Sequence, residues 1–480
     1  MNLRIALTIT LLAVLAACAT NPVTGRRELT FMSEAQEIQI ANESEAEIKE
    51  EMGVYNDPEL QRYVSEIGWR IAKISERPQL PWRFTVVDVP AVNAFAVPGG
   101  AIYVTRGILP FLDNEAELAG VIGHEIGHVT ARHSAQQYTR QISGMIGLTA
   151  LSIFVPAARP FGDLGSQALG VLFLKYGRDD EVQADGLGAG YEAKLGWDPA
   201  GVPAFLSTLG RLDEAAGDRR GVPNWLSTHP EPLARVEDIQ PAVQQLKAGG
   251  GSFATNRDAF EQRIDGIVYG DNPEQGIARG SVFLHPVLRF RIDFPQSWEI
   301  QNSPQQVMAK APGADVFMIL ELVEQPRGRN IREIAGNSMG GAGFREVRGE
   351  QATIDSLPAY VGLYQGQIEG LGAVNARAAH IDYGGKIYLV VGLAAPALFQ
   401  QADGALTTSI RSFRRLSAAE AENVRPSRVD FYVVRAGDSW AAIAERSGGI
   451  VTPATLAVMN NSAPGTPPRQ GSRIKIVVGG

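Results

Sequence analysis

One apolar run in the chain contains ionisable side chains. Between Leu118 and Val129, the residues His124, Glu125 and His128 interrupt a stretch otherwise built from aliphatic residues and glycine. Such a run favours a buried helix, and buried ionisable groups are tolerated only where they have partners. The run therefore predicts a helix inside a domain, with its three ionisable side chains gathered at a polar site.

The two histidines are four residues apart, and Glu125 directly follows the first of them. Side chains at positions i and i+4 of a helix lie on one face, so both imidazoles can bind the same cation. Imidazole suits zinc, and a glutamate beside the ligands can take a proton from water at the ion. The alternative is a pair of surface histidines without a metal, which the apolar neighbours of His124 and His128 disfavour.

An acidic segment later in the chain offers the third protein ligand that a catalytic zinc site requires. Glu181 lies at the start of a second predicted helix, and Asp185 follows one turn later. Asp185 is placed to accept a hydrogen bond from a ligand imidazole and so to fix its tautomer. The alternative is that Asp179, Asp180 and Glu181 only complement the positive end of a helix, which leaves Asp185 unexplained.

Length and composition narrow the class of protein. The 480 residues suggest about two to four domains. The 52 Asp and Glu residues against 44 Lys and Arg give a formal net charge of -8, which argues against nucleic acid as a partner. The single cysteine, Cys18, excludes a disulfide scaffold and a cysteine-rich metal site. A zinc ion would therefore be bound by histidines and carboxylates.

The N-terminus has the pattern of a secretory signal, because Arg4 is followed by an uncharged apolar stretch that ends in small residues. Residues 15–18 resemble a bacterial lipobox, which implies cleavage after residue 17 and acylation of Cys18. Ala19 then implies sorting to the outer membrane, with the body of the protein in the periplasm. The alternative is an ordinary signal peptide with an incidental cysteine. Residues 18–32 are expected to be a tether.

Four motifs occur in a characteristic order. They are Asn93–Gly100 with Ile102, the His-Glu-x-x-His helix continued to His133, Glu181 with Asp185, and Ser227–Pro230 with Arg235. Together they resemble the family forty-eight zinc metallopeptidases of the HtpX/BepA type, gluzincins that are related to the CAAX prenyl proteases. The resemblance covers roughly residues 30–245.

The resemblance implies that His124, His128 and Glu181 bind one Zn2+ ion and that Glu125 is the general base. It also implies that His229 approaches the metal, where it either occludes the site as a switch ligand or assists the transition state.

Other residues have supporting roles in this interpretation. Arg235 is a candidate for stabilising the negative charge of the transition state. The strand around Asn93 and residues 101–105 is expected to pair with an extended substrate, which recognises the backbone and suits unfolded chains. His133 is expected to face partly away from the metal and to be structural.

The whole chain is predicted to be a multidomain α+β protein. Residues 33–246 are expected to form a mainly helical gluzincin protease domain with a small edge-strand sheet. Its apolar residues 145–155 are expected to be a core helix, with a mobile lid or a surface that contacts lipid or an outer-membrane barrel as the alternatives. A linker over 247–277 leads to an α+β domain at 278–415, which faintly resembles PsbP-like folds. A second linker is expected over 416–429.

Residues 430–480 have a strand–helix–helix–strand pattern that resembles a LysM module. The Gly437-Asp438 helix start and the Asn460-Asn461 pair carry this resemblance. It implies a βααβ module that binds glycans containing N-acetylglucosamine, such as peptidoglycan. The alternative is a small domain with a purely structural role.

These observations favour a lipid-anchored periplasmic zinc endopeptidase that hydrolyses misfolded or misassembled envelope proteins. Its expected partners are those substrates, peptidoglycan and the outer membrane, and not nucleic acid. One alternative is a non-catalytic or self-inhibited chaperone or scaffold at the outer membrane, with His229 plugging the metal site. A cell-wall hydrolase is a further alternative, although zinc enzymes of that class generally have other ligand spacings.

Overall fold

The structure, a computed structural model, describes residues 18–140, 176–216, 225, 228–368 and 371–479. The predicted signal peptide of residues 1–17 and the apolar residues 145–155 lie outside the described residues. In the part of the chain that is described, no helix is both long enough and apolar enough to cross a bilayer.

The chain divides into two compact units, one of residues 1–270 with 427–479 and one of residues 271–426. Both units combine helices with sheets, so the predicted multidomain α+β class is confirmed. The predicted metal motif lies in the first unit.

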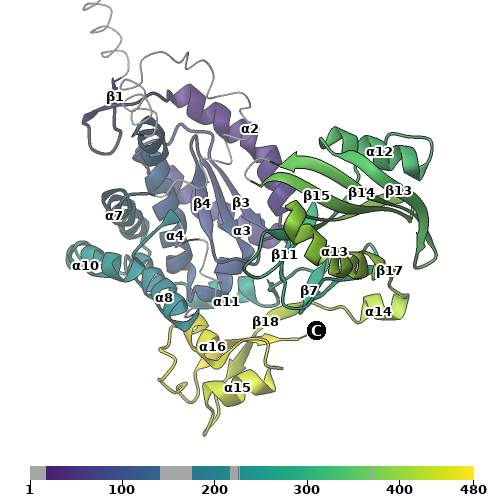
Figure 1. Cartoon of the computed structure of the whole chain (residues 1–480). Helices are drawn as coiled ribbons and strands as arrows, with labels where there is room; N and C mark the ends of the chain where they lie inside the picture. Colours follow the sequence, from purple (N-terminus) through teal and green to yellow (C-terminus); the bar gives the residue numbers. More distant parts are fainter. Residues whose placement is uncertain (1–17, 141–175, 217–224, 226–227, 369–370, 480) are drawn as a thin grey trace, which may run out of the picture. The chain divides into compact units, whose positions relative to one another are not determined.

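Helices dominate the first unit (Figure 1). Side-chain caps begin two of its helices: Ser33 and Gln36 form a capping box, and Asn114 Oδ1 accepts a hydrogen bond from Glu117 N at 3.1 Å. The larger described helices are α2 (Glu34–Met52), α3 (Pro58–Ala72), α4 (Glu115–Thr130), α7 (Arg178–Leu195), α8 (Gly201–Ala216), α10 (Pro232–Ala248) and α11 (Arg257–Ile264).

A three-stranded sheet packs beside α4 in the order β3 (Arg83–Val87), β5 (Ala101–Thr105) and β4 (Ala94–Val97). Strand β5 pairs in parallel with β3 and antiparallel with β4. The prediction that residues 101–105 pair with substrate is therefore wrong, because both edges of β5 are already hydrogen-bonded. Strand β4, which contacts α4, is the sheet edge on that side.

Small residues allow α4 and α7 to cross in close contact. An added methyl group on Gly123 would lie 3.1 Å from Gly188 Cα, and one on Gly127 would lie 3.1 Å from Ala184 Cα. These separations are shorter than ordinary van der Waals contact, so larger residues would push the helices apart. The crossing places the first turn of α7 beside the histidines of α4.

The C-terminal residues belong to the same compact unit as α4. They contain β18 (Ser427–Val433), α15 (Trp440–Arg446), α16 (Pro453–Met459) and β19 (Arg473–Val478), in the predicted order. Strand β18 also pairs with β6 (Val268–Tyr269), so the sheet order is β19-β18-β6.

Both predicted linkers contain regular structure, which corrects their assignment. Residues 247–277 include α11 and β6, and Phe260 and Ile264 of α11 are buried in the core of the first unit. Residues 416–429 include α14 (Ala418–Glu422) and the start of β18. The Gly249–Gly251 break suggested a linker, but the apolar side chains that follow it pack into the core.

A buried lysine fastens the C-terminal residues to the start of α4. Lys475 is 2% exposed, and its Nζ donates to the carbonyl oxygen of Leu112 at 2.6 Å and to Asp113 Oδ1 at 2.8 Å. Asp113 N in turn donates to Glu117 Oε2, in the first turn of α4, at 2.9 Å. The N-terminal end of α4, the helix that carries two of the predicted ligands, is therefore in contact with residues near the C-terminus.

The predicted tether is a docked hairpin. Strands β1 (Cys18–Thr20) and β2 (Arg27–Leu29) pair, and Asn21 in the turn between them donates from Nδ2 to the carbonyl oxygen of Ala131 at 3.1 Å. Ala131 directly follows α4. Residues 18–32 therefore contact the C-terminal end of this helix, which a free tether would not do.

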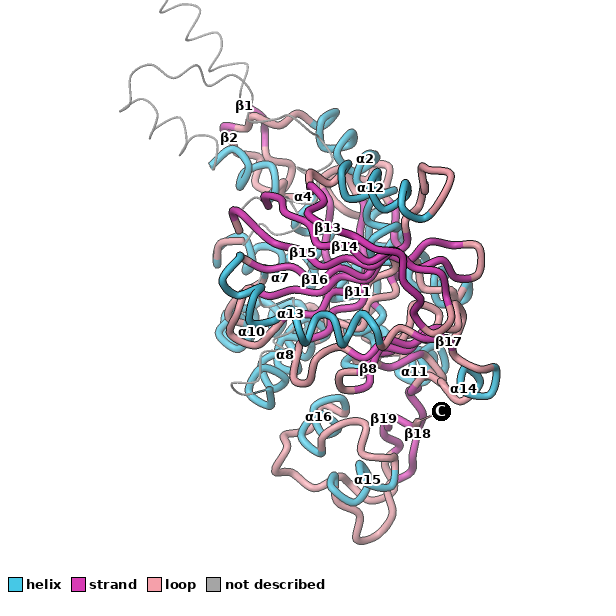
Figure 2. Tube along the Cα trace, turned by 45° about the vertical axis from the view of Figure 1, so that its right-hand side comes forward, coloured by secondary structure: helices cyan, strands magenta, loops and turns pink. Residues whose placement is uncertain are grey.

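The second unit consists of two antiparallel sheets (Figure 2). Helices α12 (Ile331–Gly341) and α13 (Pro396–Arg411) pack on opposite faces of the larger sheet. The larger sheet has the order β10 (Glu299–Asn302), β11 (Gln306–Lys310), β12 (Val316–Leu322), β16 (Lys386–Ala394), β15 (Gly372–Tyr383), β14 (Leu357–Ile368) and β13 (Arg345–Ile354). The smaller sheet has the order β17 (Arg414–Arg415), β9 (Phe290–Asp293), β8 (Val282–His285) and β7 (Ile277–Arg279).

We predict that Gly188→Ala lowers the free energy of unfolding by about 1–3 kcal/mol, because its methyl group would overpack the helix crossing. That group would lie 3.1 Å from the backbone nitrogen of His124. Gly190→Ala in the same helix is the matched control, because nothing lies within 4 Å of its added methyl group, and we expect it to stabilise by up to about 1 kcal/mol. Urea denaturation measures both, and equal effects would contradict the tight crossing.

We predict that Lys475→Met lowers the free energy of unfolding by about 1–3 kcal/mol, because Leu112 and Asp113 lose a buried donor. Lys247→Met is the control, since Lys247 is 42% exposed in its ion pair with Asp198, and a surface pair contributes at most about 1 kcal/mol. Equal denaturation midpoints for the two variants would show that the C-terminal contact does not support α4.

Candidate metal centre

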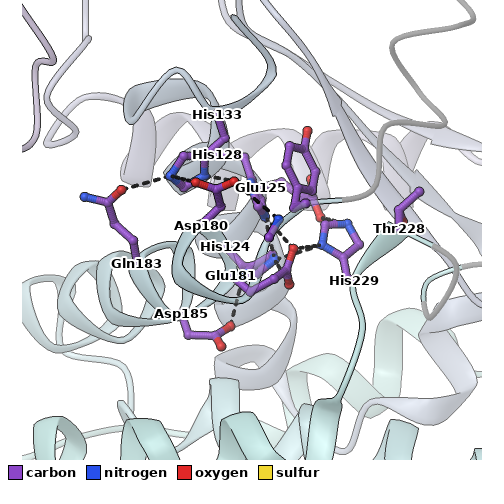
Figure 3. Close-up of polar contacts among 12 residues, drawn as sticks. His124, Glu125, His128, His133, Asp180, Glu181, Gln183, Asp185, Thr228 and His229 are labelled. Atoms are coloured by element: carbon purple, nitrogen blue, oxygen red, sulfur yellow. Dashed lines mark hydrogen bonds and ion pairs between the residues drawn. The ribbon is translucent and has the colours of Figure 1, made fainter. Parts of the chain in front are cut away.

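Four ligand-type side chains from three parts of the first unit converge below its surface (Figure 3). They are His124 and His128 of α4, Glu181 of α7, and His229, which precedes α10. All four are buried, and one ligand atom from each lies within 4.8 Å of the others. The structure thus brings together the three predicted ligands and the predicted switch residue.

The separations fit one tetrahedral zinc ion. Nε2 of His124 lies 3.0 Å from Nε2 of His128, and Glu181 Oε1 lies 3.5 Å from the latter. Zinc–ligand distances of about 2.0–2.2 Å at tetrahedral angles separate neighbouring ligand atoms by roughly 3.4 Å. Two imidazoles and one carboxylate are also the ligand set of many catalytic zinc sites.

His229 occupies the fourth position of this group. Its Nδ1 lies 3.4 Å from His124 Nε2 and 2.9 Å from Glu181 Oε1. The ring of Trp225 stacks on that of His229 with their centroids 4.2 Å apart, and His229 N donates to the carbonyl oxygen of Trp225 at 2.7 Å. These contacts orient His229 toward the other three ligands.

Burial controls the charge of the ligands. It lowers the pKa of His128 well below the ordinary value, and the nearby His124 adds to this shift. Burial raises the pKa of Glu181, but His229 and Arg235 outweigh this effect and hold the pKa below its ordinary value. Neutral imidazole and ionised carboxylate are the forms that bind a metal ion.

Asp185 and Arg235 contact the ligand side chains His124 and Glu181. Asp185 Oδ1 lies 2.9 Å from His124 Nδ1, the contact predicted to fix the tautomer of this ligand. Arg235 donates two hydrogen bonds to Asp185, at 2.8 and 2.6 Å, and its Nη1 lies 2.5 Å from Glu181 Oε2. Because its guanidinium is engaged by two carboxylates, the geometry favours positioning over transition-state stabilisation for Arg235.

Glu125 lies next to the ligands and is 1% exposed. Burial raises its pKa well above the ordinary value, and the negative charge of Glu181 adds to the shift. Its Oε1 lies 3.7 Å from His229 Nε2. A carboxylate with a raised pKa beside a metal site is suited to accept and return a proton near neutral pH.

Asn93 lies at the start of the edge strand β4. Its backbone N–H donates to Thr105 Oγ1 at 3.0 Å, and its carbonyl oxygen accepts from Thr105 N at the same distance. Its Oδ1 is buried and has no hydrogen-bond partner among the described residues. The structure thus places Asn93 at the edge of the sheet rather than among the four ligands.

Three further residues contact the ligands. His133, which was expected to be structural and to face partly away from the metal, has its Nδ1 2.9 Å from Nδ1 of His128, whose other ring nitrogen faces the ligand group. Tyr176 stacks on His128 with ring centroids 3.9 Å apart, and Trp225 stacks on His229. The position of His133, five residues after the ligand His128, could have indicated that it lies near the site. The sequence positions of Tyr176 and Trp225 give no such indication.

The isolated histidines of the second unit are not part of a metal group. Burial lowers the pKa of His285 and of His380 to about 4. Among the described residues, a group of His, Cys, Asp and Glu side chains that could hold a metal ion occurs in the first unit and not in the second.

Comparison with known proteins gives a family for part of the chain. Residues 58–243 match the model of peptidase family M48. The chain is 30% identical over 238 residues to the beta-barrel assembly-enhancing protease of Escherichia coli K12, covering 48% of each chain. It is 32% identical over 227 residues to the mitochondrial metalloendopeptidase OMA1 of Schizosaccharomyces pombe, covering 46% of this chain and 64% of that protein. The chain thus spans about half the length of the first of these relatives.

Likeness to solved structures is weak. The cyanobacterial PsbP protein of Synechocystis is 12% identical, with a TM-score of 0.22 and 30% of this chain covered. A likeness at this level does not establish the fold of residues 278–415, so their resemblance to PsbP-like proteins stays a prediction.

Proposed function

We propose that the protein is a lipid-anchored zinc endopeptidase of the bacterial envelope that hydrolyses misfolded or misassembled envelope proteins. The match of residues 58–243 to the model of peptidase family M48 supports this proposal. The observation that carries it is the buried group of His124, His128 and Glu181 with Glu125 beside it. The name of the Escherichia coli relative, a beta-barrel assembly-enhancing protease, supports an envelope substrate.

In this proposal His124, His128 and Glu181 hold the zinc ion. Zinc bound there supplies Lewis acidity, which polarises a peptide carbonyl and acidifies water. Glu125 takes the proton of the attacking water and returns it to the leaving nitrogen, for which its raised pKa is suited. Asp185 holds the imidazole of His124 in the tautomer that can bind zinc.

We assign the edge strand β4 to substrate binding. An extended peptide would add to β4 by backbone hydrogen bonds, which explains a broad selectivity for unfolded chains. Asn93, which directly precedes β4, supports this assignment, because its Oδ1 is buried without a hydrogen-bond partner among the described residues and would gain one from a substrate amide.

Two further parts of the chain would attach the enzyme to the cell envelope. Acylation of Cys18 would anchor it in the outer membrane, and the β18–β19 module would bind peptidoglycan. The docking of Asn21 on Ala131 supports an enzyme whose catalytic helix stays close to the lipid anchor, since only two residues lie between Cys18 and Asn21. These assignments place the protein at the periplasmic face of the outer membrane.

A self-inhibited state is the second candidate, and the position of His229 favours it. A catalytic zinc ion needs an open coordination position, whereas four protein ligands make a closed site. His229 stands at the fourth position and is held there by Glu181 and by the ring of Trp225. In this proposal the enzyme rests closed, and a substrate or partner opens it by displacing His229.

We predict that Glu125→Gln slows cleavage of fluorescently labelled casein by about 10²–10⁴-fold, because the proton acceptor is lost. Glu66→Gln in α3 is the control, because Glu66 has a 68% exposed side chain and is expected to leave the rate unchanged. Zinc content and thermal unfolding should match the unmodified protein in both variants. Undiminished cleavage by Glu125→Gln would rule out this mechanism.

We predict that His229→Ala speeds cleavage of the same substrate, because the fourth coordination position opens. His285→Ala in the second unit is the matched control and should not alter the rate. Cleavage rates at saturating zinc measure the effect. A slower reaction with His229→Ala would contradict self-inhibition and would favour the transition-state role instead.

A further inference from the structure

We propose that His133 and Gln183 are positioning residues that orient His128 as a zinc ligand through a hydrogen-bonded relay. The proposal rests on the zinc ligands assigned above and extends them to a pair of residues that has no contact with substrate. It begins from the side of His128 that faces away from the metal site.

The relay has two links of hydrogen-bond length. His133 is fully buried, and its Nδ1 lies 2.9 Å from Nδ1 of His128 (Figure 3). Its Nε2 lies 2.9 Å from Oε1 of Gln183, which reaches across from α7. Asp180 Oδ1 lies 3.9 Å from the same nitrogen, which is too far for a hydrogen bond.

The direction of every hydrogen bond follows once His128 binds zinc through Nε2. A neutral imidazole that gives Nε2 to a metal carries its proton on Nδ1, so His128 donates to His133 Nδ1. His133 must then carry its own proton on Nε2, which it donates to the carbonyl oxygen of Gln183. All three side chains are satisfied in one neutral arrangement, and the ring of His128 is held in one orientation.

The backbone is shaped to allow this contact. Residues five apart on a regular helix do not face each other, but Arg132 has a φ of 61° and turns the chain back beneath the end of α4. A left-handed conformation is unfavourable for an arginine. Arg132 is held in it by Glu37 Oε1, at 2.7 Å from its Nε, and by the carbonyl oxygen of Met32, at 2.6 Å from its Nη2.

The two ligand imidazoles are thereby supported by different chemistry. His124 Nδ1 lies 2.9 Å from the carboxylate of Asp185, whereas Nδ1 of His128 lies 2.9 Å from another histidine, His133. Helix α7 supplies one metal ligand, Glu181, and a support for each imidazole, Gln183 and Asp185. A shift of α7 along α4 would therefore disturb all three interactions together.

Zinc affinity of the full-length chain tests the relay without reference to catalysis. The metal-free protein competes with a chromophoric chelator for zinc, and Co2+ absorption reports the ligand geometry. His133→Phe removes the acceptor but keeps a ring, and we expect about 10–100-fold weaker zinc binding and a changed Co2+ spectrum. His133→Asn keeps an acceptor oxygen near the former Nδ1, and we expect affinity within about threefold of the unmodified chain.

Gln183→Leu removes the far end of the relay but leaves His128 its acceptor, as His133→Asn does, and should weaken zinc binding by about threefold. Gln136→Leu is the matched control, because Gln136 is also half-buried and hydrogen-bonded but contacts Glu28 and the carbonyl oxygen of Ala131 instead. If His133→Phe does not fold, the comparison of Gln183→Leu with Gln136→Leu and the zinc affinity of His133→Asn test the relay.

Three results would overturn the relay: native zinc affinity in folded His133→Phe, an equal loss in His133→Asn and His133→Phe, or equal affinities of Gln183→Leu and Gln136→Leu. Failure of the relay is distinguishable from failure of the proposed function. If His128→Ala left zinc binding intact, the ligand assignment itself would fall, whereas native affinity in His133→Phe with no binding in His128→Ala would remove only the relay.

Discussion

The close crossing of α4 and α7 is the contact on which the metal centre depends. Glycines at positions 123, 127 and 188, with the small Ala184, let the backbones of the two helices approach closely. Only at this separation can Glu181 reach the histidines of α4, since a carboxylate side chain is short. The same approach lets Asp185 and Gln183 contact residues of the histidine helix. The geometry of the site therefore depends on the small residues at the helix crossing.

Burial of this many ionisable groups is unfavourable unless they have partners of opposite charge or hydrogen-bonding partners, and the site provides such partners. Arg235 lies between Glu181 and Asp185 and compensates the charge of both. His128 and His229 have lowered pKa values because of burial and are neutral, while Glu125 has a raised pKa. The apolar surroundings that make the groups costly thus also set the protonation states that a hydrolytic zinc site needs.

Both ends of the catalytic helix are held by distant parts of the chain. The N-terminal hairpin contacts the C-terminal end of α4 through Asn21 and Ala131, and Lys475 contacts the residues before its first turn. These contacts join segments that sequence analysis had described as a tether and a separate module. The residues that are expected to bind glycan therefore belong to the first unit and also support the start of α4.

The sequence by itself determined the features that depend on local spacing. The helix from Asn114, the shared face of His124 and His128, the capping boxes and most strands follow from periodicity and short-range hydrogen bonds, which act within a few residues. It also indicated Glu181 and Asp185, because their spacing repeats the helical turn. Tertiary structure alone decided that His133 contacts His128, since this contact depends on the left-handed conformation of Arg132 just after α4. It alone decided that β5 is a central strand and that Lys475 meets Asp113 across 362 positions of the chain. Such pairings depend on which surfaces meet when the chain collapses, and no local pattern of residues encodes that choice.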